Sequence, residues 1–237
     1  MRGHAPGEYQ HVFNRGMQKQ PIFETDRDRL RFLFLILTFQ GEIVIKNVSR
    51  EVKQNAQNST LHISDELKEE ILKNRMVELT LFCLAPNHFH LVVRELVDDG
   101  ISKYMQRVLT AYTKYFNIRH EKSGHLFQGP YKSVHIKDDR QLMHTSAYIH
   151  KHPCEINGWS GKEDKYPWSS YQDCIGENRF GKLLVTDVIT ERFIESKGDF
   201  SYKKFVSSSP AKEITKELFQ QPVQSSTLHK RAITRRL

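Results

Sequence analysis

The chain has few cysteines and no long apolar segment, and both absences narrow the classes of protein to which it can belong. Three of its 237 residues are cysteine. Cys83, Cys154 and Cys174 are odd in number and do not have the spacing of zinc ligands, which argues against a disulfide framework and a structural zinc site. The longest apolar run, from Phe32 to Leu37, is far shorter than the roughly 20 residues of a membrane-spanning helix.

Two kinds of functional segment are also missing. The sequence contains no Gly-x-Gly-x-x-Gly motif and no phosphate-binding Walker loop, so ATP-driven chemistry is not indicated. The first residues, Met1 to Gly7, lack the apolar region of a secretory signal peptide. We therefore expect a cytoplasmic protein with no membrane association.

Positive charge is in excess and is concentrated near the C-terminal end. The net charge is +8, from 36 basic and 28 acidic residues. The segment from Lys203 to Leu237 contributes most of this excess. Such a segment attracts polyanions, with nucleic acid a better candidate than an acidic membrane. A tail that only improves solubility is the alternative.

Two histidines flank a phenylalanine in the apolar segment from Ala85 to Val93. Side chains of an extended strand alternate between its faces, so His88 and His90 share one face and Phe89 lies on the other. Two neutral imidazoles on a rigid strand are suited to bind a divalent cation. A bare His-x-His is more often two histidines on a half-exposed strand, so the motif needs support from elsewhere.

The predicted elements follow the order strand, helix, hairpin, helix, strand, helix. This order favours an α+β fold, with a ferredoxin-like antiparallel sheet and helices on one face. We expect residues 1–175 to form one domain, in which the polar stretch 47–74 is a surface insertion. Residues 176–206 are expected to form a helical C-terminal extension, and residues 207–237 a basic, poorly ordered tail.

Two further segments carry groups suited to chemistry on nucleic acid. His144, Tyr148 and His152 are spaced four residues apart on the last predicted helix of the domain, so they share a face. An exposed polar stripe is the alternative interpretation. The loop from Ser123 to Ser133 combines aromatic, amide and cationic groups, as do proteins that stack bases and contact phosphate.

A tyrosine and a metal can together cut and rejoin DNA. A phenol of pKa about 10 is protonated at neutral pH, so it attacks phosphorus only with help from a cation or a base. A metal on His88 and His90 would polarise the phosphate and stabilise the leaving 3′ oxygen. The resulting phosphotyrosine bond conserves energy, so a free 3′-hydroxyl can later reverse the reaction and join another strand.

These motifs also resemble a known family. Asn87-His88-Phe89-His90 resembles the His-hydrophobe-His signature of HUH endonucleases, and its setting is similar to that of single-tyrosine transposases, particularly the REP-associated branch. The resemblance runs in order through His11 to Gly16, Ala85 to Val93, Ser123 to Ser133, Tyr148 to Pro153 and Tyr166 to Tyr171. It therefore extends over roughly the first 175 residues.

The resemblance implies roles for individual residues. Tyr148 takes the place of the nucleophile, and His88 and His90 take the places of ligands to Mg²⁺ or Mn²⁺. His152 stands where the family commonly has asparagine. An imidazole there is suited to be a third ligand, and it would shift the metal preference from Mg²⁺ toward Mn²⁺ or softer ions.

The predicted function is a metal-dependent DNA transposase that cleaves and rejoins single-stranded DNA near hairpins through a covalent 5′-phosphotyrosine. We expect Arg15, Gln128 and Lys132 to contact the DNA, and the protein to act as a monomer or homodimer. One alternative is a domesticated relative that binds DNA or RNA hairpins without cleaving them. Another is a metallohydrolase that uses a metal-bound water, but the further ligands usual at such a centre are missing from the motif.

Overall fold

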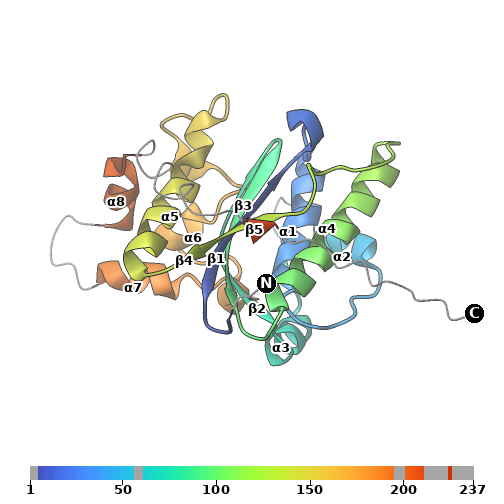
Figure 1. Cartoon of the computed structure of the whole chain (residues 1–237), viewed down its shortest axis with the longest axis horizontal. Helices are drawn as coiled ribbons and strands as arrows, with labels where there is room; N and C mark the ends of the chain where they lie inside the picture. The colour runs from blue at the N-terminus through green and yellow to red at the C-terminus, as the bar shows by residue number, and fades with distance from the viewer. Residues whose placement is uncertain (1–4, 56–60, 195–200, 211–223, 226–237) are drawn as a thin grey trace, which may run out of the picture.

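The computed structural model describes residues 5–55, 61–194, 201–210 and 224–225 (Figure 1). Along the chain, the strands and longer helices are β1 (Tyr9–Arg15), α1 (Asp26–Thr38), α2 (Val48–Asn55), α3 (Asp65–Lys73), β2 (Val77–Ala85), β3 (His88–Glu95), α4 (Gly100–Arg119), β4 (Lys132–Ile136), α5 (Asp139–Lys151), α6 (Tyr171–Ile175), α7 (Asp187–Ile194), α8 (Tyr202–Ser208) and β5 (Gln224–Ser225). Short 3-10 helices are η1 (Met17–Lys19), η2 (His152–Glu155), η3 (Glu163–Lys165) and η4 (Gly181–Leu183).

The strands form one antiparallel sheet in the order β2-β3-β1-β4-β5. In the first four strands, β1-α1-β2 and β3-α4-β4 are two interleaved crossover units, and this is the ferredoxin-like arrangement. The two-residue strand β5 extends the sheet beside β4. The predicted α+β fold with an antiparallel sheet is therefore confirmed.

The turn between β2 and β3 is tied to the chain that follows β1. Ala85 pairs with His88, so Pro86 and Asn87 alone form the turn. The Pro86 carbonyl accepts hydrogen bonds from the backbone N–H groups of Ile22 and Phe23, at 2.9 and 3.1 Å. The backbone N–H of Gly16 donates to the carbonyl of Asn87 at 2.8 Å. No side chain fits at Gly16, because an added Cβ would lie 2.1 Å from the carbonyl oxygen of Gln20. These contacts fix the His88 end of the hairpin beside the end of β1.

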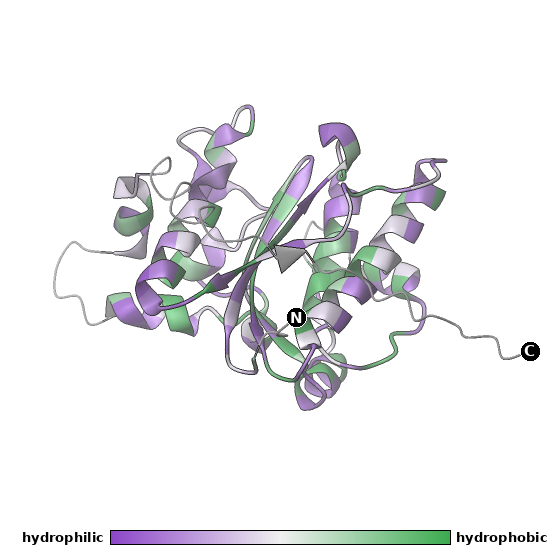
Figure 2. Ribbon diagram, viewed as in Figure 1, coloured by the Kyte–Doolittle hydropathy of each residue, from purple (hydrophilic) through white to green (hydrophobic). Residues whose placement is uncertain are grey.

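One face of the sheet packs against α1 and α4 (Figures 1 and 2). Phe89 of β3 points to this side, and its ring centroid lies 4.9 Å from that of Phe32 on α1. Tyr104 of α4 is fully buried and donates a hydrogen bond to the carbonyl of Ile36 at 2.7 Å. The predicted apolar face of the histidine strand therefore faces the main core.

The expectation that helices lie on one face only is wrong. Helix α5 packs against the opposite face of the sheet, and α6 to α8 lie beside it (Figure 1). The physical reason is visible in β3, where Leu91 and Val92 point to opposite faces and both are fully buried. A sheet with apolar side chains on both faces needs cover on both.

The stretch predicted to be a surface insertion contains α2 and α3, and its residues 56–60 lie outside the described part of the chain. It contributes the buried side chains of Val52, Ile63 and Ile71 to the core. Of the predicted basic tail, the description includes only 207–210 and 224–225. The domain boundaries proposed from the sequence stay predictions.

The structure bears on the cysteines and on the absence of a long apolar segment. All three cysteines are unpaired thiols, and Cys83 and Cys174 are buried. Within the described ranges, no helix has the length and apolar character needed to cross a membrane.

Helix α5 is anchored on the side away from the sheet's histidines. The fully buried imidazole of His150 lies between the hydroxyls of Tyr202 and Ser170, with N–O distances of 2.7 and 2.8 Å. Burial lowers the pKa of His150 to about 3, so the ring is neutral at pH 7. Ser170 also accepts a hydrogen bond from the backbone N–H of Phe82 on β2. The ring of His150 thus ties α5 to both α8 and the sheet.

We predict that His150→Leu lowers the free energy of unfolding by about 2–3 kcal/mol, because it removes two buried hydrogen bonds and leaves polar groups with fewer partners. Urea denaturation followed by circular dichroism measures this change. The matched variant Tyr202→Phe removes one of the two bonds and should cost only about 1 kcal/mol. A His150→Leu protein as stable as the wild type would show that this network does not anchor α5.

Candidate active site

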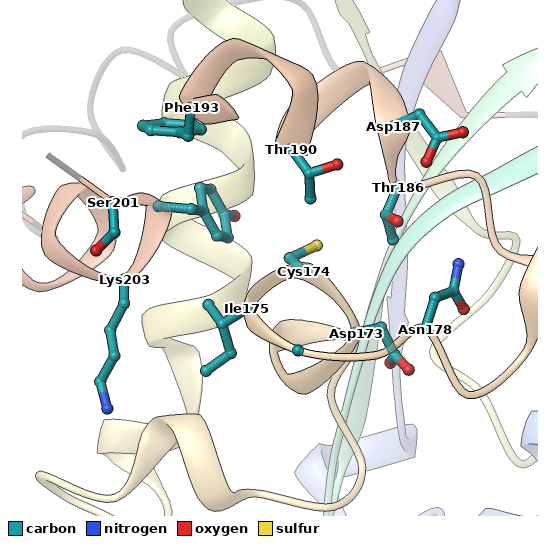
Figure 3. A pocket seen from close by; sticks show the side chains of 12 residues that line it. Asp173, Cys174, Ile175, Asn178, Thr186, Asp187, Thr190, Phe193, Ser201 and Lys203 are labelled. Carbon is teal, nitrogen blue, oxygen red and sulfur yellow. The ribbon is translucent and has the colours of Figure 1, made fainter. Parts of the chain in front are cut away.

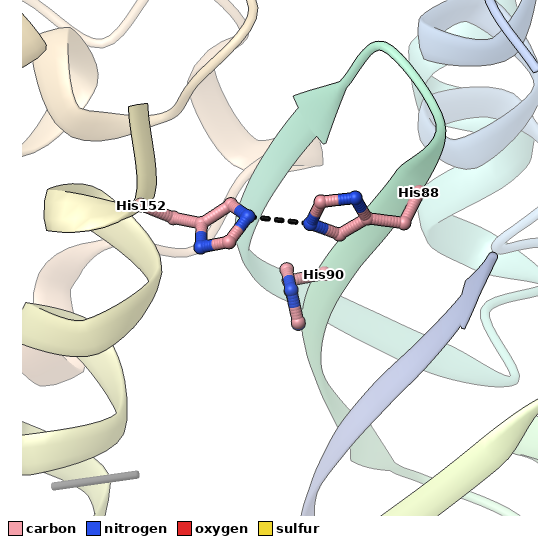
Figure 4. Close-up of side chains that lie close together, drawn as sticks. All are labelled: His88, His90 and His152. Carbon is pink, nitrogen blue, oxygen red and sulfur yellow. Dashed lines mark hydrogen bonds between the residues drawn. The ribbon is translucent and has the colours of Figure 1, made fainter. Parts of the chain in front are cut away.

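Three histidines from two elements meet where α5 covers the sheet (Figure 4). His88 and His90 project from β3, and His152 follows the last residue of α5. Their potential ligand atoms lie within 4.8 Å of one another, and Nε2 of His88 directly faces Nε2 of His152. In the described ranges, this is the group of histidine, cysteine and acidic side chains that is placed to hold a metal ion.

The chemistry of these donors fits a divalent cation. Burial lowers the pKa of His88 to about 3, aided by His152 and by the positive charge of Arg15. Burial also holds the pKa of His90 well below its usual value and lowers that of His152. All three rings are therefore neutral at pH 7 and offer lone pairs. Two ring nitrogens that face each other are attractive only when a proton or a cation lies between them.

Two of the three ligand candidates have a hydrogen-bonded neighbour that orients the ring. The Nδ1 atom of His88 lies 2.6 Å from Oδ1 of Asn87, so this N–H donates to the amide oxygen and leaves Nε2 free for a metal. The Nδ1 atom of His90 lies 2.9 Å from Nε2 of His11 on β1. The Nδ1 atom of His152 is buried without a hydrogen bond among the described residues, and a carboxylate oxygen of Glu155 lies 3.7 Å from it. Hydrogen-bonded neighbours therefore orient the rings of His88 and His90.

His11 is a site residue that the sequence alone did not indicate. It lies on β1, where it shares a strand face with Tyr9 and Phe13. No periodicity shows that β1 pairs with β3 in a register that brings His11 within hydrogen-bond distance of His90. The signal available in the sequence was a histidine on a predicted strand. It becomes informative only once the pairing register of that strand with β3 is known.

Tyr148 lies over the histidine cluster in the same chain. Its ring centroid is 5.5 Å from that of His90, 5.9 Å from that of His152 and 6.1 Å from that of His11. Burial, with smaller contributions from Glu155 and Cys83, raises the pKa of Tyr148 to about 12, so the phenol is protonated at neutral pH.

His144, which was expected to share the helix face of Tyr148, lies one turn before it on α5 and faces α8. Its ring centroid is 6.4 Å from that of Phe205 on α8. It is not a member of the histidine group that can hold a metal. The face of α5 therefore divides between the candidate site and the packing of α8.

The three predicted DNA contacts gather at the rim of the histidine cluster. Arg15 pairs with His88 across the strands, and Lys132 pairs with Phe13, which in turn pairs with His90. Residues directly opposite each other in a sheet project from the same face. Gln128 accepts a hydrogen bond from Nε of Arg15 at 2.5 Å, and the side chains of Arg15, Gln128 and Lys132 are all exposed. Two cations and an amide thus border the candidate metal site.

A separate pocket of about 700 Å³ lies among α6, α7 and α8 (Figure 3). None of the predicted site residues lines it. Two of its charged side chains are already paired, since Asp173 lies 2.7 Å from Arg179 and Lys203 lies 2.6 Å from Asp164. The candidate active site therefore lies between the sheet and α5, and not in this pocket.

The chain resembles a known protein family and a solved structure. Residues 43–152 match the family described as "Transposase IS200 like". A solved structure described as "Structure of the REP associates tyrosine transposase bound to a REP hairpin" is similar over 85% of this chain and 93% of that chain, with 16% sequence identity and a TM-score of 0.48. None of the curated proteins compared with the chain matches it.

The matched range includes all three candidate ligands and Tyr148, whereas β1 precedes it. The motifs on β3 and α5, which suggested the family in the sequence, therefore lie within the part of the chain that matches. Through residues 43–152, the chain is similar to the IS200-like transposase family.

Proposed function

We propose that this protein is a metal-dependent transposase that cleaves and rejoins single-stranded DNA beside hairpins through a covalent link to Tyr148. The observation that carries the proposal is the meeting of a phenol with three neutral imidazoles inside one chain. His88, His90 and His152 would hold Mg²⁺ or Mn²⁺. When bound, the cation would polarise the scissile phosphate and stabilise the leaving 3′ oxygen.

The reaction assigned to Tyr148 is a nucleophilic substitution at phosphorus. Its phenol oxygen bonds to phosphorus as the bond to the 3′ oxygen breaks, which yields a 5′-phosphotyrosine and a free 3′-hydroxyl. The phenol loses one proton and the leaving oxygen gains one, so protons balance. Because one phosphoester replaces another, a 3′-hydroxyl can reverse the step and join a new strand without a nucleotide cofactor.

The rim formed by Arg15, Gln128 and Lys132 supports DNA as the substrate. Two positively charged side chains beside a metal site disfavour binding of the metal itself. They favour binding of a phosphodiester that contacts both the rim and the metal. Gln128 and Arg15 also present planar groups that can contact bases. The site within one chain is consistent with action as a monomer.

Of the predictions that follow from this proposal, the first concerns the covalent intermediate. Wild-type protein mixed with Mn²⁺ and a 3′-labelled single-stranded DNA that contains a hairpin should form an adduct that survives denaturing electrophoresis. Tyr148→Phe should form none, because it lacks the attacking oxygen. Equal adduct from Tyr148→Phe would contradict the assignment of the nucleophile. Hairpin binding by the wild type without any adduct would favour the non-cleaving alternative.

The second prediction concerns the third ligand. His152→Asn should weaken Mn²⁺ binding by roughly 10- to 100-fold, the range known for disturbed metal-site residues, and should change Mg²⁺ binding less, since an amide oxygen is a harder donor than imidazole. Calorimetric titration of each ion measures both affinities. His144→Asn, the same change one turn before Tyr148, is the matched control. Unchanged Mn²⁺ affinity in His152→Asn would remove His152 from the ligand set.

The third prediction concerns the DNA rim. Arg15→Ala and Lys132→Ala should each weaken hairpin binding and reduce the slope of log K against log salt by about 1, because each removes one phosphate contact. Fluorescence anisotropy in EDTA at several salt concentrations separates this effect from metal binding. Lys68→Ala on α3, away from this sheet face, should leave the slope unchanged. Slopes that match the wild type in both rim variants would place the DNA elsewhere.

A further inference from the structure

His11 is buried against the site but takes no part in the proposed reaction. It is fully buried, and its ring stacks on that of His90 at a centroid distance of 5.1 Å and an interplanar angle of 27°. Phe13 and Tyr148 contact the same ring, at 5.0 and 6.1 Å. Its Nε2 lies 2.9 Å from Nδ1 of His90. His11 thus touches both a candidate ligand and the candidate nucleophile.

The second ring nitrogen of His11 has no partner. Among the described residues, its Nδ1 is buried without a hydrogen bond. Leaving such an atom unpaired costs roughly 1–3 kcal/mol, and a leucine or phenylalanine at this position would avoid that cost. Packing alone therefore does not account for an imidazole here.

The contact between the two rings constrains where the protons lie. A neutral imidazole carries one N–H and one lone pair, so exactly one of the two facing nitrogens donates. If Nε2 of His11 donated, the single proton of His90 would sit on its own Nε2, and neither of its nitrogens would be free for a metal. If Nδ1 of His90 donates, its Nε2 carries the lone pair. Metal binding therefore requires His11 to be the acceptor.

We propose that His11 is a positioning residue that accepts the Nδ1–H of His90 and thereby presents Nε2 of His90 to the metal. The unpaired Nδ1 of His11 then carries that ring's proton, and its desolvation is the cost of this arrangement. The role rests on the proposed function only in requiring that the histidine cluster binds a divalent cation. It is the β1 counterpart of Asn87, which accepts from Nδ1 of His88.

Two substitutions at this position separate the hydrogen bond from the packing. His11→Leu removes the acceptor, and we expect Mn²⁺ affinity to fall by about 10- to 100-fold. His11→Gln places an amide oxygen near the position of Nε2, and it should restore affinity to within a few-fold of the wild type. Phe13→Leu alters a ring that also contacts His90 but leaves the His11 bond in place, so it should retain affinity. Calorimetric titration with Mn²⁺ gives all four affinities.

The position of the ring proton of His90 can be measured independently of activity and of metal affinity. In protein with ¹⁵N-labelled histidine and bound Zn²⁺, the ring nitrogens of His90 should show a protonated Nδ1 and a metal-bound Nε2. Wild type that binds no divalent ion would refute the proposed function, and not the role of His11 alone. Two results would overturn the inference. One is equal Mn²⁺ affinity of the wild type and His11→Leu, and the other is coordination of the metal through Nδ1 of His90.

Thermal unfolding of the apo proteins controls for folding. If His11→Leu does not fold, the comparison rests on His11→Gln and on the ¹⁵N spectrum of the wild type. A His11→Gln protein that folds but loses Mn²⁺ affinity as severely as a His90→Ala variant would contradict the proposal.

Discussion

The pairing register between β1 and β3 is the constraint on which the candidate site depends. It sets Arg15 opposite His88 and Phe13 opposite His90, and it brings His11 against His90. A shift of one residue would move every side chain of β1 to the other face of the sheet. The turn contacts near Gly16 and Pro86 hold the two strands at this end, where the histidines lie.

Burial beneath α5 acts on the two kinds of group in the site in complementary ways. It lowers the pKa values of the imidazoles, so they stay neutral and keep their lone pairs at pH 7. It raises the pKa of Tyr148, so the phenol is protonated at pH 7. One physical cause, the loss of water around groups that would otherwise be charged, keeps both the candidate ligands and the candidate nucleophile neutral.

The two faces of α5 have different tasks. Tyr148 and His152 face the histidine cluster on the sheet, while His150, between them in sequence, points away from that cluster and is held by Ser170 and Tyr202. Residues beyond the matched family range therefore brace the helix that carries the candidate nucleophile. The contacts that anchor α5 therefore lie apart from the histidine cluster. The rim of the candidate site can be exposed while the helix behind it is held in place.

The sequence by itself determined the local geometry of the candidate site and the family that the chain resembles. Alternation placed His88 and His90 on one strand face, helical spacing placed Tyr148 and His152 on one helix face, and the motifs indicated the family that residues 43–152 match. Local periodicity can be recognised in the sequence because it depends on residues that are close together in the chain. Only the tertiary structure decided that these two faces meet, that a second helical layer covers the sheet, and that His11 touches His90. Those contacts depend on strand register and packing between distant segments, which no local pattern encodes.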